Sequence, residues 1–133
     1  TAMSPPYTST PYEDMGKMFR TGDIQLVTSL MEGMSTTILE GMACGLPTIC
    51  NDDAVVSEPV VPYATGLLVH RLLTNESVTD EVVERMFELS SNPGLLADMS
   101  KNAAELARIK YNWATIAQHF VYLFGTLINK RYE

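Results

Sequence analysis

One stretch of the chain decides its fold: DIQLVTSLMEGMSTTILEGMACGLPTIC, residues 23–50. Residues 24–27 have the apolar, β-branched character of a buried strand. A loop containing Gly33 follows, and residues 36–44 then form a helical segment that ends at Gly45. Residues 46–50 have the character of a second strand, with Pro47 near its start, where proline is tolerated. Strand, loop, helix and strand in this order predict a parallel sheet.

The regions on either side extend this pattern. Upstream, Thr10, Pro11 and Glu13 have the spacing of a capping box, so we expect a short helix to about residue 21, with Pro11 as its first residue. Gly22 suits the left-handed position at its end. Downstream, residues 66–69 predict a third strand. We therefore expect an α/β fold, a partial Rossmann-like parallel sheet of about three strands with flanking helices.

From Ser77 onward the pattern predicts only helices, and the last begins after Asn112, which can cap it. Its apolar residues lie on one stripe: Trp113, Ile116, Phe120, Leu123 and Phe124 or Leu127. We expect this stripe to pack the C-terminal helix onto the sheet. The opening residues 1–10, rich in Pro, Ser and Thr, are expected to be a linker or a tag-derived lead-in.

The composition excludes several classes of protein. The chain has 133 residues and a formal net charge of −7, which argues against nucleic acid as a partner. No apolar run approaches the roughly 20 residues of a membrane span, and the first residues lack the basic start of a secretory signal. We therefore expect a cytoplasmic protein. Cys44 and Cys50 lack metal-ligand spacing, so we expect reduced structural thiols and no metal site.

The candidate site centres on Glu32 and Glu40, eight positions apart, one in the loop and one inside the helix that the loop feeds. The helix N-terminus offers backbone N–H groups to a diphosphate near Ser35, Thr36 and Thr37. Helical side chains lean toward the N-terminus, so Glu40 can accept from both hydroxyls of a ribose. Glu32, at the carboxyl end of a parallel strand, can accept from a donor sugar, which Gly33 lets approach closely.

Residues 23–47 closely resemble the signature of family 4 retaining glycosyltransferases, whose members carry two glutamates with seven residues between them and then a Met-Ala-x-Gly-x-Pro turn. Residues 65–69, Asn92-Pro93 and residues 111–113 also match landmarks of that family, so the resemblance spans about residues 11–133. The chain departs from it at Gly33-Met34-Ser35 and in the loop of residues 52–58.

The resemblance implies the C-terminal half, residues 11–133, of the nucleotide-sugar-binding domain of a GT-B enzyme, with retention of configuration and no cofactor or essential metal. Glu32 would be the catalytic residue beside the donor sugar, and Glu40 would bind the nucleotide ribose. The donor sugar and diphosphate would lie against Gly33, Met34, Ser35, Thr36 and Thr37.

The resemblance also implies partners that this stretch lacks. Between Arg20 and Arg71 there is no Lys or Arg, and the family's phosphate-neutralising cations lie in the first half of the same domain. We expect the isolated chain to be inactive without that half and the N-terminal acceptor domain. Any location at the inner membrane face would come through the missing domain.

Two alternatives stay open. The chain could be a free-standing interaction module, derived from a glycosyltransferase fold, that forms a homodimer through an exposed sheet edge. It could also belong to a nucleotide-sugar epimerase or a glycogen-synthase-like enzyme of the same architecture.

Overall fold

The computed structural model describes residues 11–29, 33–53, 55–70 and 75–130. Its centre is a sheet of three parallel strands in the order β1-β2-β3. The strands are β1 (Gln25–Val27), β2 (Thr48–Asn51) and β3 (Gly66–Val69). In their register, Gln25 is opposite Thr48, and Thr48 is opposite Gly66. The predicted α/β class and parallel sheet are confirmed, and the third strand has the bounds that the sequence predicts.

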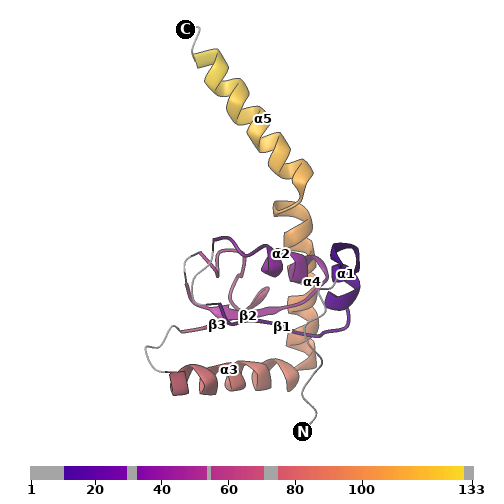
Figure 1. The fold of residues 1–133 in the computed structure, drawn as a ribbon, viewed down its shortest axis with the longest axis vertical. Coiled ribbons are helices and arrows are strands. Elements are labelled where there is room, and N and C mark those ends of the chain that lie inside the picture. The colour runs from indigo at the N-terminus through magenta and orange to yellow at the C-terminus, as the bar shows by residue number, and fades with distance from the viewer. Residues whose placement is uncertain (1–10, 30–32, 54, 71–74, 131–133) are drawn as a thin grey trace.

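The part of the chain that is described contains five helices. They are α1 (Tyr12–Phe19), α2 (Thr36–Ala43), α3 (Asn75–Ser90), α4 (Pro93–Lys110) and α5 (Trp113–Lys130). Figure 1 shows α2 on one face of the sheet and α3 on the other, with α1 beside α2 and α5 extending away from the body. Helix α4 packs against both α2 and α3 and so joins the two layers.

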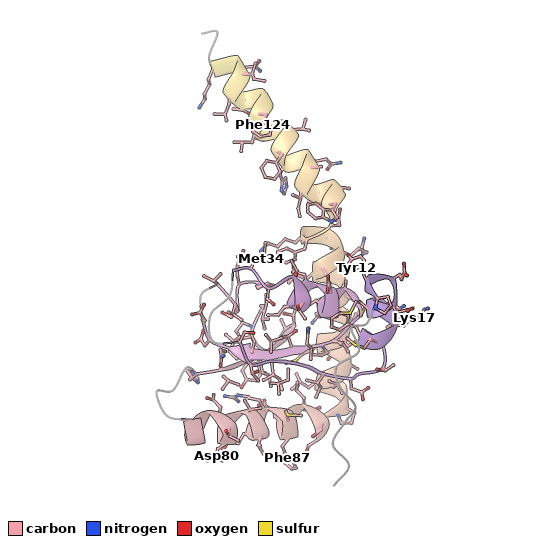
Figure 2. The ribbon with its side chains drawn as sticks, in the orientation of Figure 1. Tyr12, Lys17, Met34, Asp80, Phe87 and Phe124 are labelled. Carbon is pink, nitrogen blue, oxygen red and sulfur yellow. The ribbon has the colours of Figure 1, made fainter. Side chains whose placement is uncertain are left out.

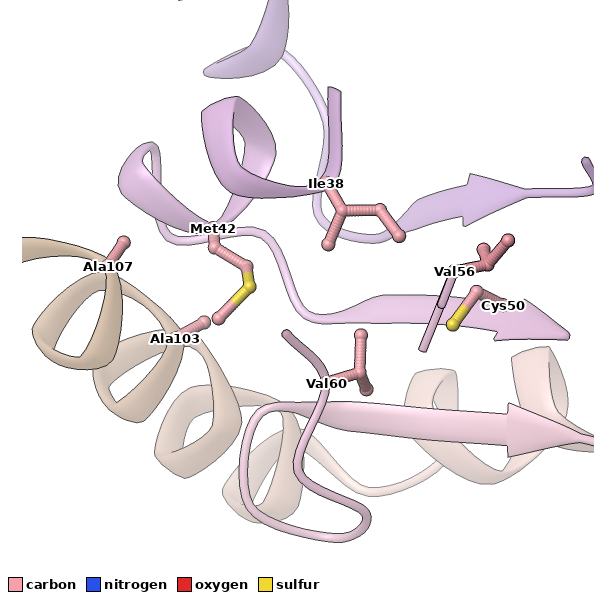
Figure 3. Close-up of a cluster of buried hydrophobic side chains, with 7 residues drawn as sticks. All are labelled: Ile38, Met42, Cys50, Val56, Val60, Ala103 and Ala107. Atoms are coloured by element: carbon pink, nitrogen blue, oxygen red, sulfur yellow. The ribbon is translucent and has the colours of Figure 1, made fainter. Parts of the chain in front are cut away.

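Successive residues of a strand point to opposite faces of the sheet. The strand residues therefore belong alternately to two apolar clusters, one on each face. On the α2 face, Cys50 packs with Ile38 and Met42 of α2 and with Val56, Val60, Ala103 and Ala107 (Figure 3). On the α3 face, Ile49, Leu67 and Val69 pack with Leu89 and Met99. The sheet is therefore covered on both sides, and α2 is fixed to it by fully buried side chains. Burial and the nearby charge of Asp52 raise the pKa of the Cys50 thiol to about 12, which keeps it protonated.

Helix α2 ends as the sequence predicts, whereas α1 does not. Gly45 has φ +82°, and the Gly45 and Leu46 N–H groups donate to the carbonyls of Met42 and Gly41, which forms a Schellman motif. Gly22 was expected in the same left-handed conformation, but among the described glycines only Gly45 has positive φ. Instead the Gly22 N–H closes a tight turn onto Phe19, so no left-handed residue is needed there.

The first residue of α1 also differs from the prediction. Pro11 has an extended ψ of 142° and lies at the N-cap, so the helix begins at Tyr12 rather than at the proline. The Pro11 carbonyl still accepts the first turn's bond from the Asp14 N–H, at 2.9 Å. The capping role predicted for Thr10 lies outside the described residues.

The prediction that α5 packs onto the sheet is wrong. Asn112 caps the helix as expected, accepting from the Thr115 N–H at 2.9 Å. No residue of α5 is buried, however, and Trp113 is 84% exposed. Figure 2 shows Phe124 far from the sheet, because α5 packs against the body mainly through α4. Among the described residues, no helix is long and apolar enough to cross a membrane.

Candidate functional site

The first predicted site residue, Glu32, lies outside the described residues, and its proposed role therefore remains a prediction. Gly33 and Met34 are described and stand exposed directly before α2. Met34 is 51% exposed, and Figure 2 shows it on the α2 side of the sheet. These two described residues directly before α2 are therefore open to solvent.

The N-terminus of α2 has no side-chain cap from its N-cap residue. Ser35 is the N-cap residue, and its side chain makes no capping hydrogen bond to the first turn. Thr36 and Thr37, the first two helical residues, are exposed. The first N–H groups of a helix have no partners inside it, and together they carry a partial positive charge. The predicted diphosphate-binding residues 35–37 thus lie together at an uncapped helix end.

A buried glutamine fixes the position of the N-terminal part of α2 relative to the sheet. Gln25 of β1 is 7% exposed, its Nε2 donates to the Thr37 carbonyl at 2.8 Å, and its Oε1 accepts from the Thr48 hydroxyl at 3.2 Å. The amide fits because Gly41 has no side chain, since a Cβ there would lie 2.6 Å from Gln25 Cδ. The sequence reasoning missed this contact, although a glycine inside a helix is the signal that could have revealed it.

Glu40 lines a cavity of about 370 Å³ between α1 and α2. Helix α2 contributes Glu40, Ala43 and Cys44, and α1 contributes Tyr12, Glu13, Met15, Gly16 and Phe19. Residues three and four apart share one face of a helix, so Thr36 and Thr37 lie on the same face of α2 as Glu40, which lines the cavity. The sequence predicts α1 as a short helix without a role in the site, yet the spacing of Tyr12, Met15 and Phe19 places their side chains on one face toward α2.

The charges around the cavity are acidic. In the described part of the chain, no Lys or Arg lines it and no ion pair includes Glu40. Lys17 on α1 is paired with Asp14 at 2.7 Å. Arg20 lies beside Gly16 but lines a separate cavity with Asp23. Within the described residues no group of His, Cys, Asp and Glu could hold a metal ion.

A second polar cluster ties the end of β3 to α3 and lies apart from this cavity. His70 donates its backbone N–H to Glu81 at 3.0 Å, and its Nδ1 lies 3.0 Å from the same carboxylate. Arg85 pairs with both Glu81 and Glu88. Burial raises the pKa of Glu81, but the hydrogen bonds from His70 and the charges of His70 and Arg85 outweigh it, so this pKa lies below its usual value. The cluster therefore stabilises the fold.

Residues 7–106 match the family described as glycosyl transferases group 1. Among curated proteins, the chain is 26% identical over 102 residues to an uncharacterized glycosyltransferase of Methanocaldococcus jannaschii, covering 77% of this chain and 27% of that one. It is also 26% identical over 117 residues to an alpha-monoglucosyldiacylglycerol synthase of Acholeplasma laidlawii, covering 88% of this chain and 27% of that one. The chain thus spans about a quarter of the length of these relatives.

Two solved structures share the fold. Sucrose-phosphate synthase from Thermosynechococcus elongatus superposes with a TM-score of 0.72 at 24% identity, over 85% of this chain and 27% of that one. The C-terminal domain of a glycosyl transferase group 1 family protein from Francisella tularensis superposes with a TM-score of 0.68 at 22% identity, over 82% of this chain and 53% of that one. The parallel sheet, its helices and the matched residues agree, and this chain belongs to the glycosyl transferases group 1 family.

Proposed function

We propose that this chain binds the nucleotide-sugar donor of a glycosyl transfer along α2. One observation carries the proposal: the face of α2 that bears Thr36 and Thr37 at its uncapped N-terminus also bears Glu40, which lines the cavity beside α1. A nucleotide sugar has three parts in the same linear order, which are the sugar diphosphate, the ribose and the base.

The length of α2 fits these parts. At about 1.5 Å per residue, Glu40 lies about 6 Å along the helix axis from Thr36. A diphosphate held by the N–H groups of the first turn would therefore place the ribose hydroxyls near Glu40, whose carboxylate can accept from both. The base would then enter the cavity. The donor sugar would extend the other way, over Gly33 toward Glu32, which we propose as the catalytic residue.

Turnover would require more than this chain. Its curated relatives are almost four times as long as the part that it matches, so the acceptor site and the cations that neutralise the diphosphate would lie elsewhere in a longer protein. We propose residues 11–133 as the second half of its donor-binding domain, acting with retention of configuration and without an essential metal. We expect the chain alone to transfer no sugar, and transfer to any acceptor would contradict this expectation.

Nucleotide binding is tested by NMR titration of the labelled chain with UDP, GDP and ADP. Binding should shift the amide signals of Thr36, Thr37 and Glu40 for at least one nucleotide. Glu40→Gln should weaken binding about 10- to 100-fold, because hydrogen bonds to a charged group contribute about 1.5 to 3 kcal/mol.

The matched control is Glu84→Gln. Glu84 is an exposed carboxylate on α3, on the opposite face of the sheet from α2, so its replacement should leave the affinity unchanged. Equal affinity of Glu40→Gln and the unmodified chain, or shifts confined to another surface, would rule out the proposed site.

A further inference from the structure

The cavity beside α1 contains a second carboxylate that donor binding, as proposed above, does not use. Glu13 lies one turn before Lys17 on α1 and lines the cavity together with Glu40. Glu13 takes part in no ion pair between described residues, whereas its neighbour Asp14 is held by Lys17 at 2.7 Å. If Glu40 accepts from the ribose, the Glu13 carboxylate remains for the base.

The other walls of the cavity offer a base little polar recognition. Met15 and Phe19 are apolar, and the Cys44 thiol points to the Gly16 carbonyl at 3.9 Å. Among the described residues, no Lys, Arg, Asn, Gln, Ser or Thr side chain lines the cavity. Tyr12, at 84% exposure, can stack on any base, because every base has a π-face. Selection among bases therefore falls mainly to one carboxylate.

An ionised carboxylate only accepts hydrogen bonds, and it accepts two side by side. Guanine presents two neighbouring donors, N1–H and the N2 amino group, which match both carboxylate oxygens. Adenine places its N6 amino group beside the N1 lone pair, and uracil flanks N3–H with two carbonyl oxygens, so each sets an acceptor against the carboxylate. A lone pair set against a carboxylate oxygen removes a hydrogen bond to the charged group and adds repulsion, so these two bases should bind less tightly than guanine.

Building on the proposed function, we propose that Glu13 selects guanine, so that the donor is a GDP-linked sugar. Glu13 and Glu40 then divide the nucleoside between them: Glu40 accepts from the ribose hydroxyls and Glu13 from the Watson–Crick edge of the base. The cavity of about 370 Å³ is in the range of small-molecule sites.

The test is a set of NMR titrations of the chain with GDP, IDP, UDP and ADP, repeated for Glu13→Gln and Asp14→Asn. GDP should bind about tenfold more tightly than UDP or ADP. IDP keeps N1–H but lacks the N2 amino group, so its affinity should fall between those of GDP and UDP. Glu13→Gln should reduce the GDP preference to about threefold or less, and Asp14→Asn, one residue away, should leave it intact.

The outcomes separate this proposal from the one on which it rests. Equal or tighter binding of UDP or ADP, or a GDP preference that survives Glu13→Gln, overturns the selection of guanine, while a loss of binding on Glu40→Gln would still support the donor site. Failure of all four nucleotides to shift any amide signal, even at concentrations up to about 100 mM, overturns both, because the contacts proposed here predict millimolar affinity or weaker. Circular dichroism of each variant verifies that the fold is kept, as expected for substitution of the exposed residue Glu13.

Discussion

Replacing Gly41 by alanine tests the packing that holds α2 against the sheet. An added Cβ would overlap the Gln25 amide, at 2.6 Å from Cδ and 3.0 Å from Nε2. Gln25 is buried, and its amide links the Thr37 carbonyl of α2 to the Thr48 hydroxyl of β2. The substitution therefore forces either a displaced glutamine or an overpacked contact between α2 and β1.

Both routes cost similar free energy. A displaced Gln25 loses two hydrogen bonds, at about 1 to 1.5 kcal/mol each, and overpacking costs about 1 to 3 kcal/mol. Alanine offsets about 1 kcal/mol of this, because glycine is a poorer helix former. We expect the free energy of unfolding of Gly41→Ala to fall by about 1 kcal/mol, with an upper bound of about 2 kcal/mol, measured by urea denaturation followed by circular dichroism.

A double-mutant cycle shows whether Gln25 is the cause. Gln25→Val removes the amide, so Gly41→Ala in that background should be neutral or stabilise by up to about 1 kcal/mol. Gly16→Ala is the control in α1, because its Cβ would meet only the flexible Arg20 guanidinium at 3.5 Å, and it should not destabilise the chain. Equal destabilisation by Gly41→Ala in both backgrounds would refute the reasoning.

Two further predictions concern the fold. Gly45→Ala should lower the free energy of unfolding by roughly 1 to 2 kcal/mol in the same assay, because φ is +82° and a Cβ is disfavoured there; no loss would contradict the left-handed end of α2. The pKa of Glu81 lies below its ordinary value of 4.5, since burial is outweighed by hydrogen bonds from His70. Its stabilisation is therefore complete above pH 4.5 and is lost as the pH falls through the folded pKa. Glu81→Gln should flatten this acid limb of the stability profile, and an unchanged limb would exclude Glu81 as its source.

The parallel sheet could be predicted because it depends on local pattern. The order of strands and helices in residues 23–69 follows from the pattern of apolar residues and from Gly45. Gly45 ends the helix, and this role follows from the residues next to it in the sequence. Gln25 was assigned to an apolar strand, and its actual role could not be predicted from the strand alone. That role depends on a space left by Gly41, sixteen residues away in sequence, and only the tertiary contact brings them together.

The error at α5 has a different cause. A 3.6-residue period predicts that a helix has an apolar face, but it does not specify which surface covers that face. Trp113 and Phe120 have the expected spacing, yet both are exposed, at 84% and 53%. The candidate site shows the same limit. The relative positions of Ser35 to Glu40 could be predicted because these residues belong to one helical segment. The cavity wall formed by α1 could not be predicted, because it depends on how two helices pack.

Electrostatics limits how much donor binding this chain can supply. A helix N-terminus contributes up to about 2 kcal/mol to holding an anion, and two hydrogen bonds to the Glu40 carboxylate add about 3 to 6 kcal/mol. Association itself costs at least about 4 kcal/mol, so the balance corresponds to millimolar affinity or weaker. The net charge of −7, with no Lys or Arg between residues 20 and 71, offers no compensation. Tight binding would therefore need cations from outside that stretch, while the proposed contacts of Glu13 and Glu40 would decide which nucleotide is held and in what orientation.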